Sequence, residues 1–225
     1  MPDLSFQVEG AEAVALAASP LLAFKLRVAD KDAGASVYSV SLQCQIRFEV
    51  TRRHYNASEQ ERLLDLFGEP ARWGQTLRPM LWTHSSVTVP SFTGSTVVDL
   101  PVPCTFDFNI AATKYFAGLE GGEVPLILLF SGTIFYTDDE GFLQIAQIPW
   151  EREARYRLPV EVWQNMMALY YPNIAWLGLR KDVFDRLYQY KIRRGFPTWE
   201  QALESILPVV ETPEGEPHGS EETVH

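Results

Sequence analysis

The sequence predicts a mainly β protein: an antiparallel β-sandwich with one short inserted helix and helices at its C-terminal end, α+β overall. Alternation of apolar and polar residues recurs through the first 159 residues, as in LSFQVEG at 4–10 and VYSVSLQCQIRFEV at 37–50. Turn residues separate these alternating segments. After Pro159 the apolar spacing changes to that of a helix, as in VEVWQNMMALYY. Strands followed by helices suit a sandwich with a helical appendix.

Eight strands are expected, and two of them carry the two cysteines of the chain. The strands are predicted at 4–10, 21–28, 37–51, 80–90, 96–110, 124–136, 142–149 and 154–159. Cys44 and Cys104 each share a strand face with apolar residues, so both thiols should point into the core. A disulfide between two packed sheets would suit this geometry, but it is not expected in a cytosolic protein. Neither cysteine has the neighbouring Cys or His of a zinc site.

Helices interrupt and end this pattern. Ser58 and Glu61 have the spacing of a capping box, which predicts a helix over 58–67 with Gly68 after its end. Further helices are predicted at 111–119, at 160–171 after Pro159, at 181–194 before Gly195, and at 199–207 after a Thr198 cap. We expect residues 1–207 to form a single sandwich domain whose helical appendix begins at about 160. The acidic tail 208–225 has no apolar face to bury and is expected to be disordered.

The charge balance disfavours two classes of partner. The net charge is −10, and the tail alone holds five Glu and no Lys or Arg. An acidic protein cannot neutralise the phosphates of nucleic acid or an anionic membrane. The longest strongly apolar run, at 124–130, is far shorter than the ~20 residues of a membrane span, so no membrane insertion is expected. The N-terminal residues lack the basic region of a secretory signal, and a cytoplasmic protein is therefore expected.

Catalytic patterns are scarce in this sequence. It has no GxSxG, GxGxxG, Walker or HExxH motif. Of the four histidines, His218 and His225 lie in the tail, His54 follows two arginines, and His84 lies in a predicted strand. The acidic residues at 138–140 occupy a turn between strands, where backbone geometry favours Asp and Gly, and they lack an EF-hand pattern. We therefore expect a non-enzymatic protein with neither a metal nor another cofactor.

The first binding candidate combines arginine, tryptophan and histidine around the stretch MLWTHSSVTVPSF at 80–92. Arginine binds carboxylate or phosphate in a forked geometry, and tryptophan offers a flat stacking surface. Strict alternation places Trp82 and His84 on the same side of a strand. The mixed polarity of both sides suggests a strand at a sheet edge, or one partly covered by the helix at 58–67 and the Pro-Ala-Arg-Trp turn. The candidate residues are Arg72, Trp73, Arg78, Trp82 and His84.

The second candidate is the stretch PWEREARYR at 149–157 with the aromatic helix that follows it. Arg152, Arg155 and Arg157 would contact an acidic partner, and Trp163 would line an apolar groove. Alternatively, neighbouring glutamates neutralise the arginines of an edge strand guarded by charge, and the aromatic helix simply packs on a sheet.

Four stretches resemble an uncharacterised bacterial family. They are RLLDLFGEPARWGQTLRPMLWTH, DLPVPCTFDFNIAATKYF, GEVPLILLFSGTIFY and LPVEVWQNMM, and the resemblance covers about residues 1–207. The family is of actinobacterial type and is encoded beside genes for NiFe-hydrogenase and its accessory proteins. It brings no catalytic motif. The resemblance implies a non-enzymatic accessory or interaction protein with a hydrogenase-related protein partner; the alternatives are a small-molecule or anion-binding sandwich and a holdase-like chaperone.

Overall fold

The computed structural model describes residues 2–31, 36–105, 110–138, 140–172, 174 and 178–207. The chain divides into two compact units, Met1–Asn173 and Ile174–His225. The strands are β1 (Leu4–Ala13), β2 (Leu21–Asp30), β3 (Ser36–Phe48), β4 (Met80–Val89), β5 (Phe92–Thr93), β6 (Ser95–Pro103), β7 (Glu123–Thr137), β8 (Leu143–Gln147) and β9 (Glu153–Pro159). The α-helices of the first unit are α1 (Ala57–Arg62), α2 (Leu64–Phe67), α3 (Trp73–Thr76), α4 (Ile110–Gly118) and α5 (Val160–Tyr170). The second unit contains α6 (Lys181–Arg194) and α7 (Trp199–Glu204).

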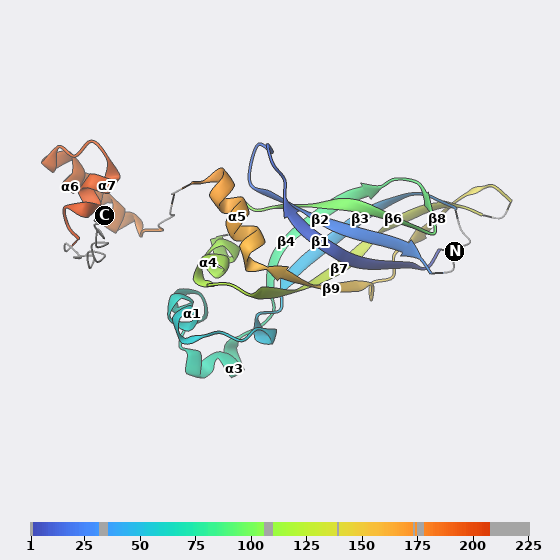
Figure 1. The fold of residues 1–225 in the computed structure, drawn as a ribbon, viewed down its shortest axis with the longest axis horizontal. Helices are drawn as coiled ribbons and strands as arrows, with labels where there is room; N and C mark the ends of the chain where they lie inside the picture. Colours follow the sequence, from blue (N-terminus) through green and yellow to red (C-terminus); the bar gives the residue numbers. More distant parts are fainter. Residues whose placement is uncertain are drawn as a thin grey trace, which may run out of the picture. The chain divides into compact units, whose positions relative to one another are not determined.

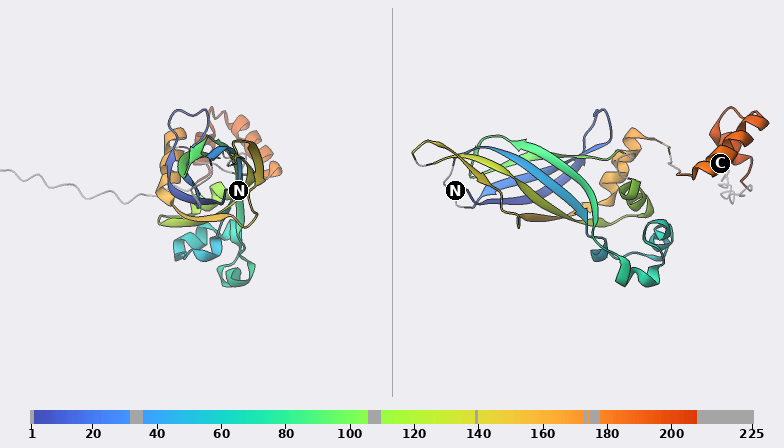
Figure 2. Two further views of the ribbon diagram at one scale, coloured as in Figure 1. Left: turned by 90° about the vertical axis from the view of Figure 1, so that its right-hand side faces the viewer. Right: turned by 180° about the vertical axis from the view of Figure 1, so that it is seen from behind.

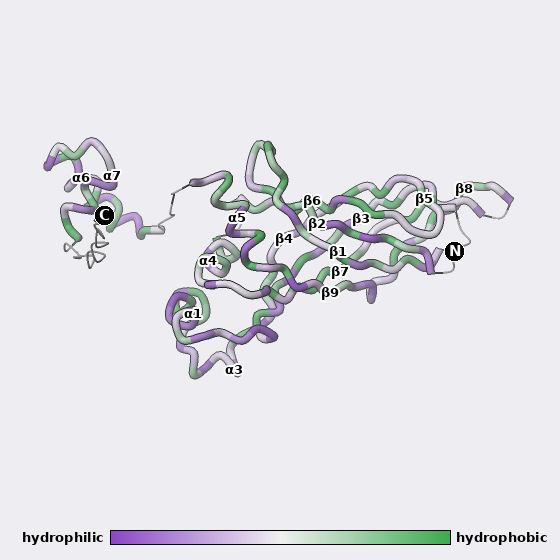
Figure 3. Tube along the Cα trace, viewed as in Figure 1, coloured by the Kyte–Doolittle hydropathy of each residue, from purple (hydrophilic) through white to green (hydrophobic). Residues whose placement is uncertain are grey.

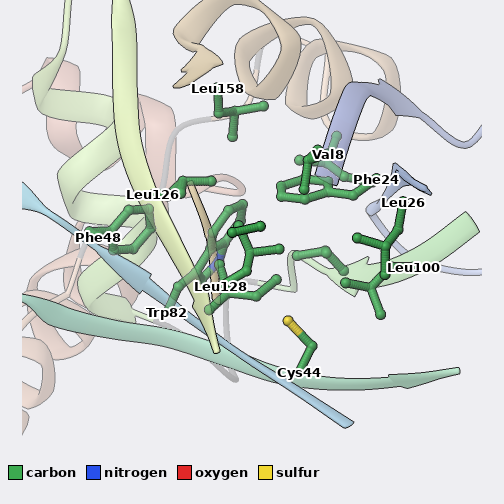
Figure 4. Close-up of a cluster of buried hydrophobic side chains, with 14 of the residues drawn as sticks. Val8, Phe24, Leu26, Cys44, Phe48, Trp82, Leu100, Leu126, Leu128 and Leu158 are labelled. Carbon is green, nitrogen blue, oxygen red and sulfur yellow. The ribbon is translucent and has the colours of Figure 1, made fainter. Parts of the chain in front are cut away.

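The strands form two antiparallel sheets, and the predicted mainly β, antiparallel sandwich is confirmed (Figure 1). One sheet has the order β1-β2-β6; the other has the order β4-β3-β7-β8, with β5 paired to β3 and β9 paired to β7. Hydrophobic and hydrophilic residues alternate along the strands, so each sheet has one apolar face (Figure 3). The two apolar faces meet in one core, in which Phe24 and Leu100 of the first sheet face Cys44 and Leu128 of the second (Figure 4).

The edges of the two sheets also approach each other. Strand β4 lies beside β6, and β1 lies beside β9. The Ser85 hydroxyl donates to the Pro101 carbonyl across the first junction, and Arg152 forms an ion pair with Asp3 near the second. The end-on view in Figure 2 shows strands of both sheets surrounding the core. These contacts close the sandwich on both sides.

Strand β7 changes partner halfway along its length. Its N-terminal half pairs with β9 up to Leu129, and its C-terminal half pairs with β8 from Thr133 onwards. Between the two, Gly132 has a φ of 139°, and a Cβ there would lie 2.0 Å from the Ser41 carbonyl oxygen. Only glycine fits this close backbone approach. The chain between β8 and β9 leaves the sheet at this point in a turn closed by a 3.1 Å bond from Arg152 N to Pro149 O.

An aromatic cluster joins the helices of the first unit to the sheets. The Trp163 ring of α5 stacks on Phe116 of α4, with centroids 4.8 Å apart. Phe116 in turn contacts Phe48 of β3 and Trp82 of β4. Figure 1 shows α1, α3, α4 and α5 at one end of the strands. Trp163 of α5 is therefore part of the core of the first unit.

Two predicted elements need correction. The helix predicted from Ser58 begins earlier, because Asn56 and Glu59 form the capping box and Glu59 is also held by Arg53. The strand predicted over 96–110 ends at Pro103, and α4 begins at Ile110. Residues 106–109 of that prediction lie outside the described residues.

Both cysteines are buried and free. This confirms that the Cys44 and Cys104 thiols point into the core. Burial disfavours the charged thiolate and raises the pKa of each thiol to about 12. The thiols are therefore small apolar core groups and poor nucleophiles.

The second unit is a pair of helices with the expected caps. Helix α6 ends at Gly195, which has a left-handed φ of 70°. Helix α7 begins after Thr198, whose hydroxyl accepts a 3.3 Å bond from Gln201 N. The single domain expected over residues 1–207 stays a prediction, and the tail 208–225 lies outside the described residues. Within the described part of the chain, no helix has the length and apolar character that a membrane crossing requires.

Candidate functional site

Three tryptophans predicted to bind a partner or ligand belong instead to the core. Trp73, Trp82 and Trp163 are only 8%, 3% and 6% exposed. Trp73 donates a 2.9 Å bond from Nε1 to the Gly68 carbonyl, and Trp82 stacks on Phe48 with centroids 5.0 Å apart. The prediction of a tryptophan surface is corrected at these three positions.

A β-bulge explains the error at Trp82. On strand β3, Ile46 pairs with Thr83 and the next residue, Arg47, pairs with Leu81. Trp82 is therefore the extra residue on β4 at a β-bulge, where the register shifts by one residue. The bulge turns its ring inward, whereas His84 remains exposed. Strict alternation had placed the two side chains on one face. The predicted edge position of β4 in its sheet is confirmed.

The five predicted arginines do not form one common site, although Arg155 and Arg157 line the same depression. Arg72 and Arg78 are exposed beside α3, and Arg78 donates a 2.7 Å bond to the Leu77 carbonyl. Each of the other three has an acidic partner: Arg152 pairs with Asp3, Arg155 with Glu153 at 3.3 Å, and Arg157 with Glu123 at 3.7 Å. Such pairing supports the reading of 153–159 as a strand guarded by charge.

Of the predicted residues, His84 lines a groove on the outer face of the six-stranded sheet. The groove has a volume of about 600 Å³, which suits a small ligand. It crosses β4, β3 and β7, and the turn between β8 and β9 adds Trp150, which is 88% exposed. Its lining consists of Gln43, Cys44, Gln45, His84, Ser85, Ser86, Leu129, Phe130, Ser131 and Trp150.

The strand register arranges the polar side chains of the groove in rows. Gln45 lies opposite His84 on β4, and Gln43 lies between Ser86 on β4 and Ser131 on β7. The Gln45 amide Nε2 lies 3.0 Å from Nε2 of His84. An amide nitrogen only donates, so the ring nitrogen accepts in this arrangement. The histidine is thereby oriented as part of a hydrogen-bonding surface.

The groove contains no charged side chain among its lining residues, whereas 21% of the whole chain is Asp, Glu, Lys or Arg. Its amide and hydroxyl groups both donate and accept hydrogen bonds. In the described residues, no cluster of three or more His, Cys, Asp or Glu side chains is placed to hold a metal ion. The arrangement is suited to recognition through neutral hydrogen bonds.

Sequence reasoning missed Gln43 and Gln45, and within the candidate stretch 149–157 it named the arginines and not Trp150. The period of two in β3 does place both glutamines on the polar face of that strand. Only the strand order brings them beside His84. Trp150 follows a proline at the end of a predicted strand, and its local sequence gives no sign of a groove.

A second candidate surface lies within the second unit. No residue of α6 is buried, and Phe184 is 43% exposed. Phe184 and Tyr188 contact the Trp199 ring of α7, with centroids 5.4 and 6.1 Å apart. A depression of about 590 Å³ on this surface is lined by Leu179, Lys181, Phe184, Leu187, Trp199 and Leu203. We call these six residues the α6–α7 surface.

The chain was also compared with known proteins. A family model described as "Family of unknown function (DUF6084)" matches residues 1–214. No curated protein matches the chain.

Proposed function

We propose that this chain, which belongs to the DUF6084 family, is a non-enzymatic interaction protein that binds a protein partner on its α6–α7 surface. The exposed aromatic and aliphatic side chains of that surface are the observation on which the proposal rests. Contiguous exposed apolar patches on soluble proteins mark interaction sites. Trp and Tyr residues are also over-represented among those that dominate binding energy.

Burial of this surface would release substantial free energy. Covering a large apolar side chain is worth about 1.5–3 kcal/mol. Phe184 on α6 and Trp199 on α7 form a depression that can receive an apolar side chain of a partner helix or strand. The two-helix unit is too small to bury both faces of its helices by itself.

The charge of residues 174–207, the part of the second unit that precedes the acidic tail, indicates the chemistry of the partner. Residues 174–207 contain six Lys or Arg and four Asp or Glu, whereas residues 1–173 contain 13 and 20. Lys181 lines the depression, and Lys191 Nζ lies 5.7 Å from the centroid of the Trp199 ring. A partner segment that alternates apolar and acidic residues would match both the apolar depression and its basic surroundings.

A hydrogenase-related protein is the first partner to test. This part of the proposal, like the actinobacterial setting, is supported by the sequence resemblance described above. An accessory protein in that setting would hold a hydrogenase subunit or another accessory protein during assembly.

The test is co-purification of the tagged full-length chain from its native host. Phe184→Ser and Lys181→Glu alter the surface, and Leu16→Ala is a matched control at a fully exposed apolar residue of the first unit. We expect the wild-type and control proteins to retain one defined partner that both surface variants lose. Circular dichroism verifies that the variants keep their helices.

Two outcomes would overturn this proposal. One is recovery of the tagged chain alone under conditions that preserve weak complexes. The other is capture of many unrelated unfolded proteins together with suppression of their aggregation, which would identify a holdase instead.

A further inference from the structure

We infer that the groove on the outer face of the six-stranded sheet binds a neutral, hydroxyl-rich ligand of the saccharide class. This function is separate from the proposed partner binding, because every residue that lines the groove belongs to the first unit. The inference rests on the neutrality of the groove, the arrangement of its amides and the position of Trp150.

The absence of charged side chains is confined to the groove and does not extend over the whole outer face of the sheet. Farther along the same outer face, Arg47 of β3 and Arg155 of β9 lie in one row on either side of Ile127. The adjacent row runs from His84 through Gln45 and Leu129 to Glu153 of β9, so a charge stands at its far end, outside the groove. The row through Gln43 carries an amide between the hydroxyls of Ser86 and Ser131. The charged side chains of this face thus border the groove, and none of them lines it. A ligand without charge accounts for this pattern.

The lining matches the chemistry of sugar hydroxyls. Each hydroxyl of a sugar donates one hydrogen bond and accepts others, so a good site offers both kinds of group close together. Gln43 and Gln45 each offer an amide oxygen and an amide NH₂, and Ser86 and Ser131 flank Gln43 on its two neighbouring strands. Anions are disfavoured, because no Lys or Arg lines the groove to supply a charge-assisted bond.

Trp150 supplies the apolar surface that such a ligand needs. Its backbone is held in the turn by the bond from Arg152 N to Pro149 O, and Arg152 O accepts a 2.9 Å bond from Phe130 N of β7. The preceding Ile148 is buried and donates a 2.9 Å bond to the Gly132 carbonyl. Because the backbone of the turn is anchored, only the two side-chain torsions of the indole must be ordered when a flat C–H face of a sugar ring packs on it.

The inference is tested with the full-length chain and a panel of neutral oligosaccharides, which includes β-linked and α-linked glucans and xylans. Binding is measured by tryptophan fluorescence and by calorimetry. We expect at least one neutral oligosaccharide to bind with a dissociation constant of about 1 mM or less. Trp150→Ala and Gln45→Ala should each weaken that binding about tenfold, whereas Trp150→Phe should weaken it less.

Controls separate this site from the α6–α7 surface. Tyr38→Ala changes an exposed aromatic residue of β3 that does not line the groove, and it should leave sugar binding unchanged. Phe184→Ser should also leave it unchanged while abolishing partner capture. The inference fails if the folded chain binds no neutral saccharide at about 10 mM, if only acidic sugars bind, or if Trp150→Ala binds as tightly as the wild type.

Discussion

The phenolic oxygens of Tyr55 and Tyr115 lie 2.9 Å apart in the protein interior. The Tyr55 oxygen also lies 2.9 Å from the Val50 carbonyl oxygen. Since a carbonyl only accepts, Tyr55 donates its single proton to Val50 and accepts the hydrogen bond of Tyr115. The pair thus connects helix α4 to the segment between β3 and α1.

This direction predicts an asymmetry between two conservative variants. Tyr55→Phe removes the acceptor for the Tyr115 proton and the donor for the Val50 carbonyl, so we expect a loss of about 2–3 kcal/mol. Tyr115→Phe removes only one bond to an oxygen that keeps its other partner, and it should cost about 1 kcal/mol. Urea unfolding of both variants measures the difference. Equal losses, or a larger loss for Tyr115→Phe, would contradict the assigned direction.

The same buried groups predict alkaline destabilisation. Burial raises the pKa of Tyr55 to about 12 from 10.0 and raises that of Tyr115, while the pKa of Cys44 and of Cys104 rises to about 12 from 9.0. Above pH 9 the unfolded chain loses these protons first, which stabilises the unfolded state. Stability should therefore be unaffected by these groups below pH 9 and should fall between pH 9 and 12.

Urea midpoints measured from pH 8 to pH 11 test this dependence. Each raised group can remove at most about 1.4 kcal/mol per pH unit. Replacing both Cys44 and Cys104 by alanine should move the onset of the loss towards pH 10, where the tyrosines titrate in the unfolded chain. A midpoint that stays constant to pH 11 in the wild type is incompatible with this account.

Gly132 should tolerate no side chain. In Gly132→Ala the new Cβ would meet the Ser41 carbonyl oxygen at 2.0 Å, at a φ of 139° that L-residues rarely adopt. The strands β3 and β7 would have to separate there, and we expect a loss of at least about 3 kcal/mol. Gly74→Ala is the matched control, since nothing lies within 4 Å of its Cβ position. Thermal unfolding of the two variants compares them, and similar melting temperatures would refute the strain.

The Arg53–Glu59 pair should be a major stabilising contact. Arg53 Nη2 lies 2.5 Å from Glu59 Oε1, and both side chains are nearly buried. Glu59 also accepts a 3.1 Å bond from Glu120 N and caps α1. Glu59→Ala leaves the arginine charge buried without its partner, so we expect a loss of about 3–5 kcal/mol. Chemical denaturation measures it, with the exposed neighbour Glu61→Ala as the control; a loss below about 1 kcal/mol in Glu59→Ala would show that the pair contributes little.

The local signals of the sequence identified most elements of the fold. The alternation in β1–β4 and β6–β9, Pro159 before α5, Gly195 after α6 and the Thr198 cap of α7 all depend on interactions within a few residues of the chain. The two-residue strand β5 was missed, since a bridge of that length has no periodicity to detect. The cap of the inserted helix was placed two residues late, at Ser58 instead of Asn56, because Arg53 and the distant Glu120 also hold Glu59 in place.

The candidate site was far less predictable. Trp82 and His84 appeared to share a face, and the bulge opposite Ile46 and Arg47 separates them. A bulge depends on the pairing of two strands, and the inward position of the indole depends on its packing against Phe48 and Phe116. Neither can be recognised from the sequence of one strand. Trp73 and Trp163 are likewise buried in the core, and the residue spacing within their own segments does not reveal this.

The sequence by itself determined most of the strands, the end of α6 at Gly195, the Thr198 cap of α7 and the buried position of the thiols, because periodicity and capping are properties of short stretches. Only the tertiary structure decided what the protein exposes. The pairing of β3 with β4 brings Gln43, Gln45 and His84 into one groove. Strand β7 pairs with β9 along its first half and with β8 along its second half, and the turn between β8 and β9 places Trp150 at the rim of the groove. Such neighbours are joined by backbone hydrogen bonds between distant segments, so their meeting cannot be read from either segment alone.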